Sequence, residues 1–162
     1  MAAIDHHRDW AGRHVGQEST RVALMSIHPE YADAILRGTK RVEFRKRPLA
    51  ADVTTVVIYA TAPLRRVVGT FEIERSVVAT PATLWRRFSD VGGISKADFF
   101  AYYDGTDRAV GLVIRHTTRW KEALTLSDLR PGLTPPQSFL YLPDTTLRRF
   151  TSADRPVLTA IG

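Results

Sequence analysis

The chain of 162 residues contains no cysteine. This absence excludes disulfide bonds, thiolate metal sites and a cysteine nucleophile. The chain also has no apolar run of the length that a membrane-spanning helix needs, and its first residues, MAAIDHHR, lack the apolar core of a signal peptide. We therefore expect a cytoplasmic protein that does not enter a membrane.

Acidic residues are too few to balance the basic ones. The 17 Asp and Glu face 23 Lys and Arg, which gives a formal net charge of +6 and a pI of about 10.1. Such an excess favours a polyanionic partner, and nucleic acid is the leading class. The 44% hydrophobic and 25% charged residues are ordinary for a globular protein. The length predicts one domain.

Much of the positive charge lies in the segment 37–47, RGTKRVEFRKR, which carries six cations and one carboxylate in eleven residues. A helix is predicted just before it, over 29–37, with Pro29 at the first helical position and Gly38 as its C-terminal stop. A cation cluster of this density is typical of a phosphate-binding surface. Phosphate binding does not account for the single acidic residue of the segment, Glu43, which must have a separate role.

Alternation within this segment predicts a strand over 40–45. Val42 and Phe44 fall on one face, which would pack on the core. The other face carries the charged residues Arg41, Glu43 and Arg45. We therefore expect the charged face to look into water or into a cleft.

The rest of the pattern predicts an α+β fold, a small mixed β-barrel with flanking helices. Further strands are predicted at 21–27, 54–61, 66–75, 109–115 and 119–121, helices at 80–88 and 95–103, and a proline-rich loop at 126–138. Gly69 predicts a bulge or bend in its strand. We expect a flexible or loosely docked N-terminal extension over 1–20, a domain over 21–143 and a C-terminal extension over 144–162.

Several short motifs, taken in order, resemble the ASCH domain of the PUA-like superfamily. They are SIHPEYA at 26–32, the Gly38-x-Lys40-x-x-Glu43-x-Arg45 signature, VIYAT at 57–61, the strand that contains Gly69, Ile94-Ser95 with Phe99-Phe100, and PQSF at 136–139. The resemblance spans residues 22 to about 142. It implies a PUA-like β-barrel with a cleft bordered by the first helix and the Gly-x-Lys-x-x-Glu-x-Arg segment.

Members of this superfamily bind RNA or modified nucleobases, and a few ASCH proteins are reported as hydrolases of acylated cytidine or as ribonucleases. By resemblance, Lys40, Glu43 and Arg45 would line the cleft, together with Ser26, Tyr59 and the loop of Gln137 and Ser138. This chain has Glu43 where the amidohydrolase-type relatives carry a threonine nucleophile. The resemblance therefore does not carry that particular chemistry over.

Our first hypothesis is a nucleic-acid-binding module, with RNA or a modified base in a basic cleft. The expected ligand-binding residues are Ser26, Tyr31, Arg37, Lys40, Arg41, Glu43, Arg45, Lys46, Arg47, Tyr59, Gln137 and Ser138. Arg45 offers a planar fork for phosphate or guanine, and the two tyrosines offer stacking faces. Like charges at Arg37 and Arg41 are expected to lower the pKa of Lys40.

The alternative is a metal-independent hydrolase of a modified nucleoside or RNA, in which Lys40 and Glu43 are catalytic. A third possibility is a regulatory domain that holds a small anionic metabolite in the same cleft. No metal is expected, because the histidines near the N-terminus lack carboxylates at ligand spacing. No glycine-rich phosphate loop is present, and no cofactor is expected.

Overall fold

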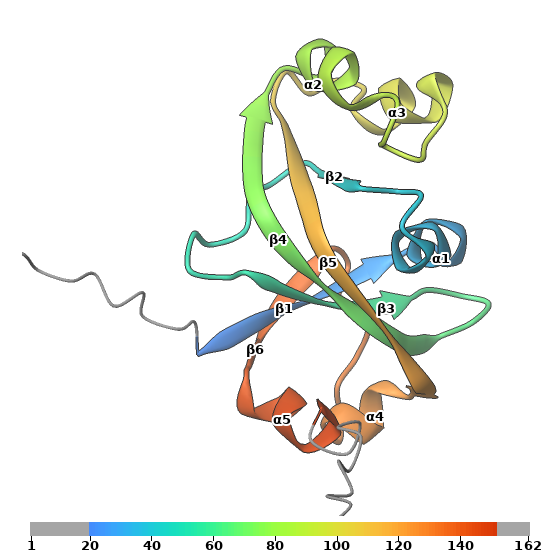
Figure 1. The fold of residues 1–162 in the computed structure, drawn as a ribbon, viewed down its shortest axis with the longest axis vertical. Coiled ribbons are helices and arrows are strands. Elements are labelled where there is room, and N and C mark those ends of the chain that lie inside the picture. The colour runs from blue at the N-terminus through green and yellow to red at the C-terminus, as the bar shows by residue number, and fades with distance from the viewer. Residues whose placement is uncertain (1–19, 152–162) are drawn as a thin grey trace, which may run out of the picture.

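Six strands form one sheet in the described part of the chain, residues 20–151 of this computed structural model (Figure 1). The elements are β1 (Arg21–Ile27), α1 (Pro29–Arg37), β2 (Val42–Arg45), β3 (Thr55–Ala60), β4 (Arg66–Ala79), α2 (Pro81–Phe88), α3 (Lys96–Tyr102), β5 (Ala109–Leu124), α4 (Leu126–Leu129), β6 (Phe139–Pro143) and α5 (Thr145–Thr151). The predicted extensions fall outside the described residues over 1–19 and 152–162.

The strand order is β2-β5-β4-β3-β1-β6, with β1 and β3 parallel and the other pairs antiparallel. The mixed α+β class is confirmed, but the predicted β-barrel is wrong, because the sheet does not close. The edge strands β2 and β6 have only 4 and 5 residues, and the sheet stays open between them. The bulge predicted at Gly69 is confirmed by register shifts on both sides of β4 at this residue.

Strands β1 and β3 are buried on both faces. Alternate residues such as Met25 and Ile58 join a core cluster with Ile35 of α1. Their neighbours, such as Leu24 and Val57, join a second cluster with residues of α4 and α5. This burial on both faces explains why the two strands are almost continuously apolar in sequence.

The helices begin and end largely where local signals predict. Pro29 occupies the first turn of α1, and Gly38 follows it in the left-handed conformation with φ of 83°. The hydroxyls of Thr80 and Ser95 accept from backbone N–H groups at the start of α2 and α3. The structure has a short helix, α4, where the sequence predicted a loop. A capping box between Thr125 and Asp128 stabilises the start of this helix.

The helices α2 and α3 pack on β2 and on the neighbouring ends of β4 and β5 (Figure 1). Val42 and Phe44 of β2 lie in a third cluster with Leu84, Phe88 and Phe99. This pair of helices therefore covers the apolar face of the charged segment. No helix within residues 20–151 is long and apolar enough to cross a membrane.

Candidate functional site

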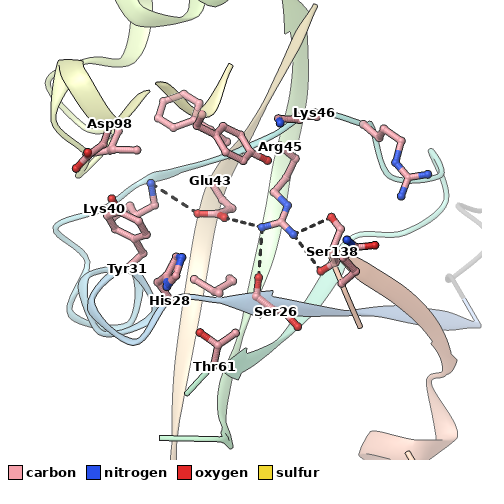
Figure 2. Close-up of a pocket in the computed structure, with 16 residues that line it drawn as sticks. Ser26, His28, Tyr31, Lys40, Glu43, Arg45, Lys46, Thr61, Asp98 and Ser138 are labelled. Atoms are coloured by element: carbon pink, nitrogen blue, oxygen red, sulfur yellow. Dashed lines mark hydrogen bonds and ion pairs between the residues drawn. The ribbon is translucent and has the colours of Figure 1, made fainter. Parts of the chain in front are cut away.

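A pocket of about 630 Å³ lies beside the end of β1, the start of α1, strand β2 and the segment that leads into β6 (Figure 2). This volume is in the usual range for a ligand site. Nine of the twelve residues expected from the sequence line it: Ser26, Tyr31, Lys40, Glu43, Arg45, Lys46, Arg47, Gln137 and Ser138. The pocket occupies the region where the open sheet brings its two edge strands near each other.

Lys40 lines this pocket and yet is only 2% exposed. Its Nζ donates a hydrogen bond to the carbonyl oxygen of Gly92 and lies 3.6 Å from Oε2 of Glu43. The rings of Tyr31 and Phe44 flank the ammonium, with centroids 5.2 and 5.0 Å from Nζ, a cation–π arrangement. Burial lowers the pKa of Lys40, while the charge of Glu43 raises it in part.

Glu43 lies between two buried cations (Figure 2). Its Oε1 accepts from Nη1 of Arg45 at 3.2 Å, and its Oε2 faces Lys40. Glu43 is 6% exposed and Arg45 is 9% exposed. A single buried carboxylate thus serves two buried cations, and the cluster keeps an excess of positive charge. Because unpaired buried charge is costly, this arrangement favours an anion in the pocket.

Arg45 connects three separate parts of the chain. Its Nη2 donates to the carbonyl oxygen of Ser138 at 3.0 Å and to the Ser138 hydroxyl at 2.9 Å, and its Nη1 approaches the Ser26 carbonyl oxygen at 3.4 Å. The Ser26 hydroxyl in turn donates to the Pro136 carbonyl oxygen at 2.6 Å. Among the described residues, Arg45 Nε is a buried nitrogen without a hydrogen-bond partner.

Two exposed cations, Lys46 and Arg47, line the pocket directly after β2. Lys46 Nζ lies 4.9 Å from the ring centroid of Tyr102, and Arg47 Cζ lies 5.8 Å from that of Phe139. Burial raises the pKa of Tyr102 and of Tyr31. Both phenols therefore remain protonated at neutral pH and can donate hydrogen bonds.

No group of three or more His, Asp or Glu side chains in the part of the chain that the structure describes is arranged to hold a metal ion. The carboxylates that line the pocket are Glu43 and Asp98. Glu43 is already paired with Lys40 and Arg45. The protein groups in the pocket are thus suited to an anion with hydrogen-bonding edges.

A family model described as the ASCH domain matches residues 25–123, more than half of the chain. This chain belongs to the ASCH domain family. The match confirms the resemblance to the ASCH branch of the PUA-like superfamily. It also covers Lys40, Glu43 and Arg45 of the buried cluster.

Similar proteins include the ASCH domain-containing ribonuclease of Zymomonas mobilis, which is 36% identical over 123 residues, 74% of this chain and 83% of the relative. The large ribosomal subunit protein uL22 of Ureaplasma parvum is 31% identical over 127 residues, and the chain spans only 40% of that relative. The crystal structure of ASCH from Zymomonas mobilis has a TM-score of 0.75 at 32% identity, covering 81% of this chain and 94% of the other. The open-sheet architecture is therefore that of an ASCH domain.

Three of the expected residues lie outside the ASCH pocket. Arg37 is exposed and pairs with Asp33 of its own helix at 2.8 Å, and Arg41 is exposed. Tyr59 is 4% exposed and belongs to a core cluster. The expected cause of the lowered Lys40 pKa is also wrong, since burial is the main cause and Arg45 is the cation that adds to it. Of the two settings expected for the charged face, Glu43 and Arg45 take the second, because they are buried and line the pocket, whereas Arg41 is exposed to water.

The pocket of the ASCH domain also includes residues that the sequence did not place there. Asp98 and Tyr102 lie four residues apart on α3 and line the pocket, as do Ile94 and Thr61. His28, which precedes α1, lies there too, with its ring centroid 6.1 Å from that of Tyr31. The spacing of Asp98 and Tyr102 was the available signal, because residues four apart share one face of a helix.

Proposed function

We propose that this ASCH domain binds RNA and that a phosphate or a nucleobase edge of the RNA occupies the pocket, which acts as a basic cleft. The observation that carries the proposal is the buried cluster in which Lys40 and Arg45 share the single carboxylate of Glu43. An anion beside this cluster offsets its excess positive charge in a poorly hydrated environment.

The residues at the rim of the pocket favour nucleic acid, rather than a small anion, as the ligand. Lys46 and Arg47 are exposed cations positioned to follow a phosphate backbone beyond the pocket. Tyr31 and Tyr102 supply aromatic faces at the same site, and single-stranded RNA is commonly held by stacking on such side chains. The similarity to a protein named a ribonuclease, at 36% identity over most of its length, further supports RNA as the partner.

Binding can be tested by fluorescence anisotropy with a labelled single-stranded RNA at about 50 and 200 mM salt, since phosphate contacts weaken steeply over this range. Lys40→Met should weaken binding at least tenfold, while Lys96→Met, at an exposed position on α3, should bind like the wild type. Equal affinity of both variants would remove the pocket from the proposal.

Cleavage of the bound RNA is a second candidate function. Burial lowers the pKa of Lys40, which makes its ammonium a better proton donor near neutral pH. His28 supplies an imidazole to the same pocket, and an imidazole is suited to accept a proton. The name of the Zymomonas mobilis relative favours this activity.

RNA carries its own nucleophile for this reaction. The 2′-oxygen attacks phosphorus and its proton passes to the imidazole of His28. The bond from phosphorus to the 5′-oxygen breaks, and the leaving oxygen takes a proton from Lys40. The products are a 2′,3′-cyclic phosphate and a 5′-hydroxyl. Arg45 stabilises the negative charge that develops on the phosphate.

RNA with a 2′-O-methyl group at each nucleotide separates the two functions. It should bind with an affinity close to that of the unmodified strand and stay intact, because the nucleophile is blocked. Unmodified RNA should yield cyclic phosphate ends, detected by mass spectrometry, and should stay intact with Lys40→Met. Cleavage of the methylated strand would contradict the 2′-oxygen mechanism and leave the binding proposal standing.

A further inference from the structure

We infer that the Gly92–Gly93 turn, which links α2 to α3, is a positioning element. It holds the ammonium of Lys40 at the position in the pocket from which Lys40 acts on RNA. This inference rests on the proposed function, because it assigns the turn a part in what Lys40 does. The turn lies 52 residues from Lys40 in sequence and belongs to the helical pair rather than to the strand that follows Lys40.

The first argument is the hydrogen bond from Lys40 Nζ to the Gly92 carbonyl oxygen. Oε2 of Glu43 lies 3.6 Å from the same nitrogen, and the rings of Tyr31 and Phe44 flank it. The Gly92 carbonyl is thus the backbone acceptor that fixes where one N–H of Lys40 points. A shift of the turn would break this hydrogen bond and leave the ammonium free to reorient.

The second argument is that the turn lies too close to Lys40 and Phe44 to carry a side chain at either glycine. A Cβ on Gly93 would lie 2.8 Å from Lys40 Cβ and 3.0 Å from its Cγ, and Gly93 has a φ of +60°. A Cβ on Gly92 would lie 2.7 Å from the Phe44 ring. Two adjacent glycines therefore allow the turn to rest directly against the stem of Lys40.

The third argument is that a backbone hydrogen bond joins the residue before this turn to the segment that leads into β2. Arg41 N–H donates to the Val91 carbonyl oxygen at 2.7 Å. Val91 therefore contacts the backbone of Arg41, Gly93 lies against the first atoms of the Lys40 side chain, and Gly92 accepts from its end. The helical pair also brings Ile94, Asp98 and Tyr102 to the pocket, so a displaced turn would move both Lys40 and this wall.

The test compares Gly93→Ala with Gly105→Ala. Gly105 has a φ of +74°, and a Cβ there would meet nothing within 4 Å. Both substitutions therefore carry the same kind of backbone strain, but only Gly93→Ala presses on Lys40. The direct readout is the labelling rate of Lys40 by an amine-reactive reagent, followed by mass spectrometry. Thermal unfolding of each variant shows that it is folded.

We expect Gly93→Ala to raise the labelling rate of Lys40 at least tenfold, while Gly105→Ala leaves it at the wild-type value. With RNA, Gly93→Ala should lower kcat at least tenfold with a smaller change in KM, and should shift the pH–rate profile. Should Gly93→Ala fail to fold, Gly93→Asn introduces the same Cβ with less strain, because Asn tolerates positive φ better.

Wild-type labelling of Lys40 in both folded Gly93 variants would overturn the inference. So would increased labelling with unchanged kcat and pH profile in a protein that cleaves RNA. If the wild-type protein neither binds nor cleaves RNA, the proposed function fails while the labelling result still decides whether the turn holds Lys40.

Discussion

Arg45 and Ser138 join the two edges of the open sheet through side-chain hydrogen bonds, because Nη2 of Arg45 donates to both the carbonyl oxygen and the hydroxyl of Ser138. Arg45 ends β2, and Ser138 immediately precedes β6. A guanidinium therefore bridges the place where a barrel would close by backbone pairing. The gap it spans is lined by the residues of the pocket.

Arg45→Ala should lower the free energy of unfolding as well as RNA affinity. The substitution leaves the buried Glu43 and the half-buried Ser138 without the donor of their hydrogen bonds, at a cost of about 1–3 kcal/mol. Arg41→Ala, at an exposed position in the same segment, should stay within about 0.5 kcal/mol of the wild type. Urea unfolding measures both. A stable Arg45→Ala protein would show that the bridge does not hold the edges together.

Glu43→Gln should be strongly destabilising, because it leaves Lys40 and Arg45 as two buried cations without a carboxylate. Removing one partner of a buried ion pair costs about 3–5 kcal/mol. The control is Glu72→Gln, whose partner Arg115 forms an exposed pair at 2.6 Å and which should cost less than about 1 kcal/mol. Added phosphate should raise the melting temperature of Glu43→Gln more than that of the wild type. Equal shifts would argue against an anion beside the cluster.

The lowered pKa of Lys40 makes the stability of the protein depend on pH. The unfolded chain keeps its lysine protonated up to its ordinary pKa, while the folded protein releases the Lys40 proton at lower pH. The unfolded state thus binds more protons between these two values, so stability rises with pH in that window. Tyr31, Tyr102 and Tyr103, whose pKa values are raised, work in the opposite direction above pH of about 10.

The difference between wild type and Lys40→Met isolates this contribution, because the tyrosines cancel. The free energy of unfolding of the wild type should increase relative to Lys40→Met as the pH rises through the alkaline range below about 10. Lys96→Met should run parallel to the wild type. A difference that stays flat, or that falls with pH, would contradict a destabilised ammonium at Lys40.

Lys46 and Arg47 should each contribute to RNA affinity through the phosphate backbone. Replacing either by Met should weaken binding to all sequences alike and reduce the slope of log affinity against log salt by about 1. Arg37→Met is the matched control, since Arg37 is paired with Asp33 away from the pocket. If Arg37→Met reduced the slope of log affinity against log salt as much as Lys46→Met does, the phosphate contacts would not be confined to the pocket and would include α1.

The sequence alone determined the features that depend on neighbours in the chain. Pro29 and Gly38 bound α1, Thr80 and Ser95 cap the next two helices, and each signal acts within one helical turn. The ordered ASCH motifs identified the family for the same reason, since they preserve local spacing. Alternation in β2 correctly separated the apolar face from the charged one.

Only the tertiary structure decided which residues surround the charged face of β2. All four residues of β2 are buried, because the α2–α3 pair covers Val42 and Phe44 and the pocket residues enclose Glu43 and Arg45. Besides Glu43, Lys40 and Arg45 have acceptors that lie 52 and 93 residues away in sequence. Alternation shows which side chains share a face and contains no information about distant partners. The burial of the cations, and with it the lowered pKa of Lys40, therefore follows from the packing of the whole domain.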